Sequence, residues 1–325
     1  TNRLGFSHTL ILGSAFSVAM YIILFFLTPE NLPWLIVPMT VAWVGFRLFH
    51  WVPFHVDFTL FTRDGERGRQ VSLSFATIAF MGVVGPILAG FIIEHAGYNA
   101  LFGTAIILLL AATVSYAFVP ETDSHFDWSF GETWRRLCSR DMRGIVVGEF
   151  ANGAEVAVHM IVWPIFLFEL LQGDVFEIGA VSTIVVGLTI IIQLVLGRYL
   201  DTRSGAKERT LRIGSSLSAL GWILKIFVLS TVHVFLVSLY HNVVRIFTKT
   251  PFSAILYDIS GEQGQYVDEF TVLREMSGQF GRAASLIVIS LLSLLVPIGW
   301  TFIIAAAASV ALNMIYRLRP TALVS

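Results

Sequence analysis

Cysteine and charged residues are scarce in this chain, and their scarcity excludes several classes of protein. Its 325 residues contain one cysteine, Cys138, so the chain forms no internal disulfide, and it lacks a spaced cysteine and histidine set that would hold zinc. Charged residues make up only 13% of the chain, whereas a soluble domain averages about 25%. The formal net charge of -1 gives no reason to expect nucleic acid or an acidic partner.

Apolar residues are abundant instead, at 56% of the chain, and they gather in long runs. Ten runs approach the ~20 residues that a helix needs to cross ~30 Å of hydrocarbon. They cover residues 9–27, 33–60, 71–92, 98–119, 143–171, 177–197, 208–230, 233–257, 271–295 and 298–317. The sequence therefore predicts an all-α polytopic membrane protein with ten transmembrane helices.

Positive charge alternates between the connections that join these runs. The connections near 28–33, 93–99, 172–176, 230–233 and 296–299 hold no lysine or arginine. The alternate connections hold Arg63, Arg67 and Arg69; Arg135, Arg136, Arg140 and Arg143; Arg198, Arg203, Lys207, Arg209 and Arg212; Arg274; and Arg317 and Arg319. By the positive-inside rule these second connections, and the C-terminus, are predicted to be cytoplasmic.

One basic connection carries a motif, G-R-Y-L-D-T-R-S-G-A-K-E-R, over residues 197–209. It resembles the G-x-x-x-D-R-x-G-R-R loop of major facilitator superfamily transporters. Gly197 and Asp201 match in register, and Arg203 and Gly205 match when Thr202 is counted as an insertion. The resemblance implies a gating loop in which Asp201, Arg203 and Arg209 form an interhelix charge cluster that holds one end of the pathway shut.

The stretch Pro120-Glu121-Thr122-Asp123 resembles the P-E-[ST] that closes helix six in that family. It predicts a partial N-terminal bundle of four helices at 1–119, a cytoplasmic central loop at 120–142 and a C-terminal six-helix bundle at 143–325. Because the family has twelve helices, and residues 1–13 can be laid on 202–214, the sequence is expected to lack family helices one and two.

A further resemblance lies at Met81–Gly90, M-G-V-V-G-P-I-L-A-G. Gly82, Gly85, Pro86 and Gly90 are similar to a helix-five motif of several facilitator groups. Small residues allow helices to approach closely and the proline bends the helix, so a helix bend is expected here. Plain helix packing without an antiporter role is the alternative interpretation.

Polar residues inside the apolar runs are the candidates for the transport path, because charge at mid-bilayer is costly and seldom faces lipid. The polar side chains of one run lie on a common face of the predicted helix; Glu155 and His159, for example, are one turn apart. The candidates are Arg47, His50, Asn152, Glu155, His159, His241, Arg245 and Arg282. Five others are expected to be interfacial or structural, since they are isolated or nearer the ends: Asp57, Glu149, Lys225, Lys249 and Arg274.

The resemblance implies a secondary active transporter that moves a small molecule by alternating access, as a monomer in a prokaryotic plasma membrane. No G-x-x-x-x-G-K-[ST] motif for ATP is present, and no cofactor is expected. Glu155 and His159 could exchange a proton, and three arginines deep in the runs (Arg47, Arg245, Arg282) favour an organic anion as substrate.

Two other functions stay open from the sequence. The first is a transporter-like sensor or scaffold that does not transport. The second is a membrane metalloenzyme with ligands among His50, His55, Asp57, His159 and His241. His50 and His55 lie roughly 140° apart around a helix, which is poor geometry for one ion and disfavours an enzyme.

Overall fold

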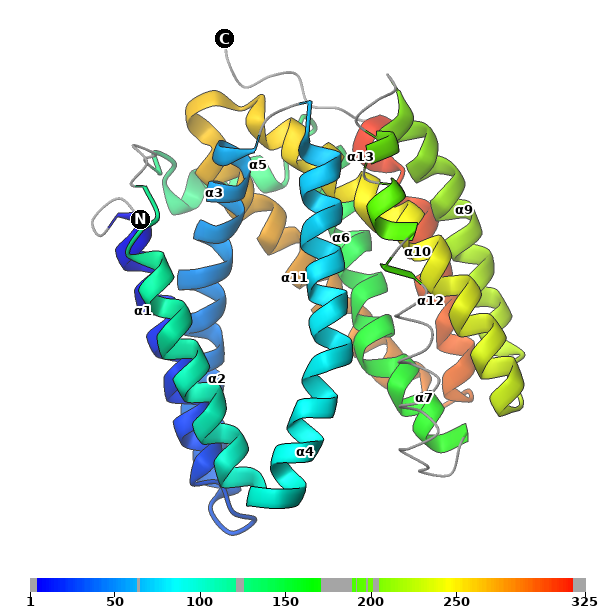
Figure 1. Ribbon diagram of the computed structural model, residues 1–325. Helices are drawn as coiled ribbons and strands as arrows, with labels where there is room; N and C mark the ends of the chain where they lie inside the picture. Colours follow the sequence, from blue (N-terminus) through cyan, green and yellow to red (C-terminus); the bar gives the residue numbers. More distant parts are fainter. Residues whose placement is uncertain are drawn as a thin grey trace. The chain divides into compact units, whose positions relative to one another are not determined.

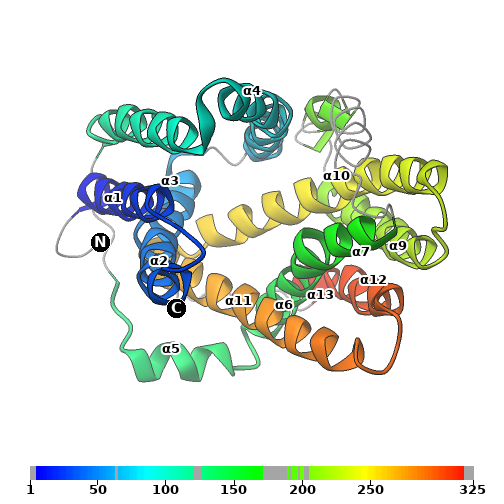
Figure 2. The ribbon, with the colours of Figure 1, turned by 90° about the horizontal axis from the view of Figure 1, so that it is seen from below.

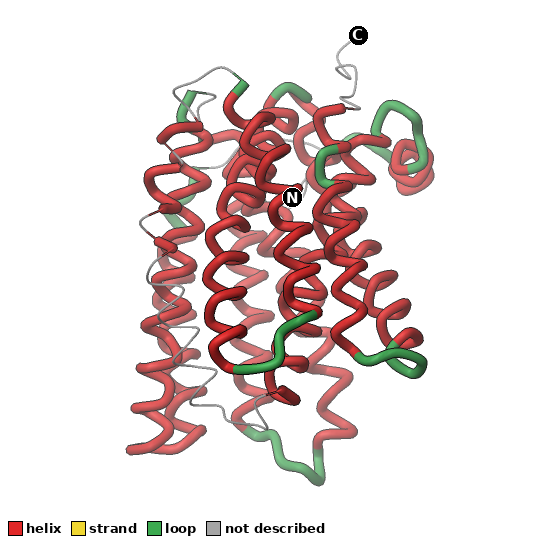
Figure 3. Tube along the Cα trace, turned by 90° about the vertical axis from the view of Figure 1, so that its right-hand side faces the viewer, coloured by secondary structure: helices red, strands yellow, loops and turns green. Residues whose placement is uncertain are grey.

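The computed structural model describes residues 5–62, 65–120, 126–170, 189–190, 192–196, 198–200 and 205–317. Every regular element in these residues is a helix, and they contain no strand (Figure 3). The all-α fold that the apolar runs predict is therefore confirmed. The described residues separate by their contacts into two units, and each is considered by itself.

Unit 1 comprises Thr1–Phe61, Val84–Asp127 and Gly264–Val272. Helix α1 (Phe6–Phe25) packs against a continuous helical run made of α2 (Leu32–Phe46), the π-helical segment η1 (Arg47–Trp51) and α3 (Val52–Phe61) (Figure 1). Gly13 marks a close approach, because a Cβ there would lie 2.8 Å from the His50 Cβ. The absence of a side chain at Gly13 lets the two helices approach without a steric clash.

Helix α4 (Arg67–Tyr116) covers two of the predicted runs. Gly97 divides it with a φ of 79°, a left-handed conformation that glycine adopts without steric cost. The chain reverses direction at this point (Figure 1). The sequence predicts a short connection without lysine or arginine at residues 93–99, and in the structure this connection is a turn centred on Gly97.

Unit 2 comprises Thr62–Val83, Trp128–Gln263 and Leu273–Ser325. Its first helices are α5 (Phe130–Leu137), α6 (Arg143–Ala157), the π-helical η2 (Val158–Val162) and α7 (Trp163–Leu170). They are followed by α9 (Ala206–Ile226), α10 (Thr231–Gly261), η3 (Gly264–Tyr266, in unit 1), α11 (Val267–Leu292), η4 (Ile298–Thr301), α12 (Phe302–Ala311) and α13 (Met314–Arg317).

Helix α9 is central to the packing of unit 2, where it lies against α10 and α12, while α12 also packs on α6 (Figure 2). The aromatic core at this junction consists of Trp163, Trp222 and Phe302, and the last two are fully buried. Three large rings at one junction fix the spacing of α7, α9 and α12, and with it the positions of the polar side chains nearby.

Five described stretches are long and apolar enough to span a bilayer, and many of their large side chains are exposed: Phe6–Phe25, Leu32–Phe61, Leu88–Tyr116, Arg143–Leu170 and Ile298–Tyr316. Outward-facing apolar surface of this extent is typical of a protein solvated by lipid. Helices α9, α10 and α11 are equally long but carry ionisable residues. The number of ten spans and the division at residues 120–142 stay predictions.

Candidate functional site

Helices α6 and α11 approach each other closely enough for short polar side chains to meet. A Cβ on Gly153 of α6 would collide with the Gly278 carbonyl oxygen, and one on Gly281 of α11 would collide with the Phe150 carbonyl oxygen. The backbones are therefore almost in contact at two levels. This contact places the buried face of α6, with its two glutamates, against neighbouring helices.

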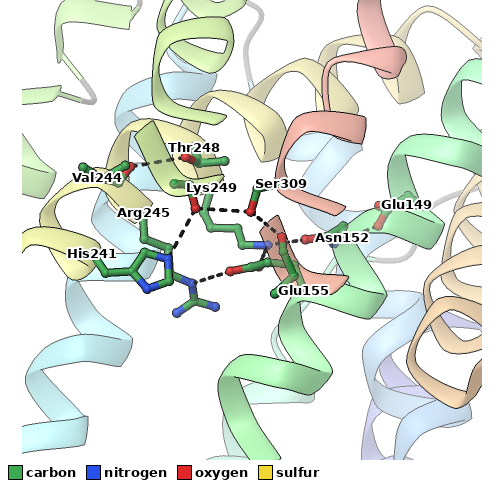
Figure 4. A network of polar contacts seen from close by, with 11 residues as sticks. Glu149, Asn152, Glu155, His241, Val244, Arg245, Thr248, Lys249 and Ser309 are labelled. Atoms are coloured by element: carbon green, nitrogen blue, oxygen red, sulfur yellow. Dashed lines mark hydrogen bonds and ion pairs between the residues drawn. The ribbon is translucent and has the colours of Figure 1, made fainter. Parts of the chain in front are cut away.

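Glu155 is the centre of a buried charge cluster. Its side chain is 1% exposed and forms an ion pair with Lys249, and its Oε1 lies 3.6 Å from the Arg245 Nε (Figure 4). Both cations come from α10, one turn apart, so a single helix face serves the carboxylate. A carboxylate removed from water costs several kcal/mol, roughly, and two cations offset that cost.

Asn152 extends this cluster one turn along α6. The Lys249 Nζ donates a hydrogen bond to the Asn152 Oδ1 (2.7 Å), and the Asn152 Nδ2 donates one to the Glu149 Oε2 (2.9 Å). The Glu149 Oε1 in turn lies 3.3 Å from the Arg274 Nε of α11. One continuous polar network therefore joins α10, α6 and α11, and Figure 4 shows its part from Lys249 to Glu149.

A second group, of aromatic and basic side chains, adjoins the cluster. The ring of His241 contacts that of Trp222 at 4.5 Å and lies 6.4 Å from that of His159, between centroids. Its Nε2 is 3.3 Å from the Ser218 hydroxyl. Lys225, 1% exposed, lies over both Trp163 and Trp222, with Nζ 3.9 and 4.0 Å from the ring centroids.

Two candidate histidines occur in π-helical segments, His50 in η1 and His159 in η2. A π-helical turn is rare and widens the helix locally, and it is frequent at functional sites. The Nδ1 atoms of both rings are buried, and neither finds a hydrogen-bond partner among the described residues. No hydrogen bond from the described residues therefore holds either Nδ1 atom.

Two of the candidate residues, Arg47 and His50, belong to unit 1. The Arg47 guanidinium lies over the Trp51 ring at 5.2 Å, and the His50 ring packs between Phe46 and Phe54. In unit 2, Arg282 donates a hydrogen bond to Gln279 on the exposed side of α11, at 3.4 Å. The structure thus brings together Asn152, Glu155, His159, His241 and Arg245 from the predicted set.

The other two predicted motifs are only partly described. Gly197, Asp201 and Arg203 of the gating loop lie outside the described residues, while Gly205 begins α9 with a φ of 68° and Arg209 is exposed. In the helix-bend motif, a Cβ on Gly82, Gly85 or Gly90 would meet no described atom within 4 Å. The close helix approach predicted for these glycines is therefore not seen among the described residues; the side chain of Pro86 is not described.

A separate charge cluster lies where α4 and α9 begin and α10 nears its end. The Asp258 carboxylate pairs with Arg67 (3.3 Å) and with Lys207 (2.6 Å). Arg67 is 4% exposed and also donates a hydrogen bond to Thr62. Arg67 and Lys207 lie in connections that the sequence predicts to be cytoplasmic, and nothing in the sequence pattern distinguishes Asp258.

Three charges that the sequence placed at the interface or in a structural role belong to the polar network, and Lys225 is buried beside it; the three are Glu149, Lys249 and Arg274. Lys249 lies near the predicted end of its run, which suggested an interfacial position. Helix α10 continues to Gly261 and carries Lys249 inward. Burial of Lys225 could have been suspected, since it lies three residues from Trp222 on the same helical face.

Metal binding was the basis of the enzyme alternative. The described residues contain no group of three or more His, Cys, Asp and Glu side chains that could hold an ion. His159 and His241 are near each other, but among the described residues they belong to no group of three such ligands. The alternative therefore has no candidate site in the part of the chain that the structure describes.

No protein-family model and no curated protein sequence matches the chain. Solved structures of major facilitator superfamily transporters match it over nearly its full length, and they show that it has their fold, as the loop motif predicted.

Three of these structures illustrate the match. The human organic anion transporter MFSD10 (TETRAN) is 13% identical over 96% of this chain and 77% of its own, with a TM-score of 0.71. The proton:xylose symporter XylE is 13% identical over 98% and 81%, with a TM-score of 0.70. The transporter FucP in its outward conformation is 15% identical over 99% and 84%, with a TM-score of 0.68.

Proposed function

We propose that the protein is a secondary active transporter that moves a small solute across a membrane by alternating access. The observation that supports it is the ion pair of Glu155 with Lys249 and Arg245 inside a bilayer-spanning bundle. Ionisable groups at that depth are expensive and are usually retained for a substrate or ion pathway. The shared fold is one in which two helical bundles rock about a central site.

Proton coupling is the second part of the proposal. Glu155 and His159 lie one turn apart across the junction of α6 and η2, and the carboxylate faces two cations on α10. A proton on Glu155 weakens its attraction to Lys249 and Arg245, which would allow α6 and α10 to separate. Protonation and a helix rearrangement are then linked by the same ion pair.

The gating loop keeps its proposed role of holding one end of the pathway shut through Asp201, Arg203 and Arg209. The proposed location is the plasma membrane of a prokaryote, with the C-terminus in the cytoplasm. These parts of the proposal rest on the loop motif and on the distribution of arginine and lysine.

Reconstituted liposomes test the proposal. A pH gradient across the membrane should drive accumulation of a solute from a labelled panel of sugars, amino acids and carboxylates. Glu155→Gln should abolish this accumulation and leave exchange of internal for external solute, because the carboxyl can no longer load a proton. Full accumulation by this variant would contradict the coupling role, and binding without any movement of solute would instead identify a sensor or scaffold.

A further inference from the structure

Lys225 is a buried cation that forms no direct ion pair with a carboxylate among the described residues, although Glu155 is near enough to interact with it. Its side chain is 1% exposed, and within the described residues it makes no hydrogen bond and no ion pair. Its ammonium group instead lies against the faces of Trp163 and Trp222. Aromatic faces attract a cation but carry no net negative charge, so they do not neutralise it.

Like the Lys225 ammonium group, the terminal nitrogens of Arg245 are hydrogen-bond donors that no described residue uses. Only its Nε faces Glu155, while the two terminal nitrogens point away from that carboxylate (Figure 4). They have no partner among the described residues, and the side chain is 24% exposed. A guanidinium fixed at Nε presents its terminal nitrogens as a planar fork, the geometry that binds a carboxylate or phosphate in two hydrogen bonds.

The charges of this core do not balance. Glu149 is used by Arg274, and Glu155 is used by Lys249 and Arg245. The four cations Lys225, Arg245, Lys249 and Arg274 therefore face three carboxylates, because the half-buried Glu275 also interacts with Arg274. A buried excess of positive charge is unfavourable unless an anion supplies the missing charge.

His241 links the two unused groups. Its ring contacts Trp222, which also lies under Lys225, and it precedes Arg245 by one turn of α10. Trp222 and His241 thus connect the surroundings of the two cations, and together with Trp163 they offer ring surface that suits an apolar or aromatic body. Arg245 is partly exposed and Lys225 is not, so a ligand reaches the guanidinium first.

We propose that Arg245 and Lys225 bind the carboxylate of a transported small organic acid, and that Trp163 and Trp222 pack against its apolar part. This inference rests on the proposed transport function and names its substrate class. It assigns Lys225 a role that burial among aromatic rings alone does not require.

Benzoate is a suitable probe, with neutral benzamide as its matched control because it has the same ring and no charge. Binding is measured on the full chain in detergent by the shift in unfolding temperature and by quenching of tryptophan fluorescence. Benzoate should stabilise the protein and benzamide should not. Arg245→Gln and Lys225→Met should each weaken benzoate binding at least about tenfold, since each removes a charge-assisted contact.

Arg212→Gln is the control substitution, because Arg212 is an exposed cation on the same helix as Lys225. It should leave benzoate binding unchanged. Lys225→Met should also raise the unfolding temperature of the ligand-free protein, because an unpaired buried charge is replaced by an apolar side chain of similar length. A lysine with a purely structural role would instead give a lower unfolding temperature and unchanged benzoate binding, and that result would overturn the proposal.

The proposed transport function and the proposed anion site can be disproved independently of each other. Benzoate binding that depends on Lys225 and Arg245, in a protein that moves no solute in liposomes, would keep the anion site and remove the transport function. Accumulation of a neutral solute, together with equal responses to benzoate and benzamide, would keep the transport function and remove the anion site.

Discussion

At the scale of single residues, the core of unit 2 is organised by two carboxylates, each of which has two polar partners. Glu155 faces Lys249 and Arg245, and Glu149 receives Arg274 and the amide of Asn152. Because each carboxylate is surrounded by protein, its removal leaves buried positive charge behind. Such pairs cost more to break than they contribute when intact.

A double-mutant cycle measures the interaction free energy between Glu155 and Lys249. Glu155→Gln and Lys249→Met should each destabilise the protein by about 3 kcal/mol, since each leaves a buried partner uncompensated. The double variant should lose clearly less than the sum, giving a coupling of about 1–3 kcal/mol in unfolding measurements in detergent.

The control cycle uses Glu132→Gln and Arg135→Met on α5, where Arg135 is 77% exposed. That pair should couple by less than about 1 kcal/mol, because water screens it. Additive losses at Glu155 and Lys249 would show that the two side chains do not interact in the folded protein.

At the scale of elements, contact between helix backbones positions these side chains. Gly153 and Gly281 lie where α6 and α11 almost touch, and a methyl group at either position would meet a carbonyl oxygen of the other helix. Gly153→Ala and Gly281→Ala should each separate the helices and cost about 1–3 kcal/mol, as overpacking does. The measurement is the free energy of unfolding in detergent.

Gly103→Ala in α4 is the matched control, because a Cβ there would meet nothing within 4 Å. It should be neutral or stabilise the protein by up to about 1 kcal/mol, since alanine favours a helix over glycine. Equal effects at Gly103 and Gly153 would indicate that glycine conformational freedom, and not close packing, governs both positions.

Asp258 joins three elements, since Arg67 begins α4, Lys207 lies in the first turn of α9 and Asp258 lies in the last turn of α10. If this cluster restrains one end of the transport path, Asp258→Asn should lower transport in liposomes several-fold while benzoate binding is kept. Asp258→Glu should retain most of the rate. Glu262→Gln, one turn away and exposed, is the control and should transport normally.

At the scale of the whole molecule, the predicted orientation in the membrane can be checked with the single native cysteine. Cys138 is exposed and follows α5, inside the connection predicted to be cytoplasmic. A membrane-impermeant maleimide should therefore label it in inside-out vesicles and not in intact cells. Labelling of intact cells would reverse the topology.

Leu295→Cys in a Cys138→Ser background serves as the opposite reporter, because Leu295 is 82% exposed near a connection free of lysine and arginine. It should be labelled in intact cells. Labelling of both positions from the same side would contradict an odd number of crossings between them.

The sequence by itself determined the class of the molecule. Long apolar runs cannot be solvated by water, and only helices satisfy their backbone groups in lipid, so an all-α membrane fold followed from composition and run length. Spacing along one helix also placed Asn152, Glu155 and His159 on a common face, and His241 and Arg245 on another. The loop at residues 197–209 then identified the fold that the solved structures show.

Only the tertiary structure decided which faces meet. Lys225 and Lys249 look isolated or interfacial along the chain, but the fold places Lys225 of α9 against two indoles, one of them from α7, and pairs Lys249 of α10 with Glu155 of α6. Asp258 is likewise separated from Arg67 by 191 residues along the chain and joined to it in space. Helical periodicity records the direction of each side chain relative to its own axis, whereas the identity of its partner depends on how helices distant in sequence pack against one another.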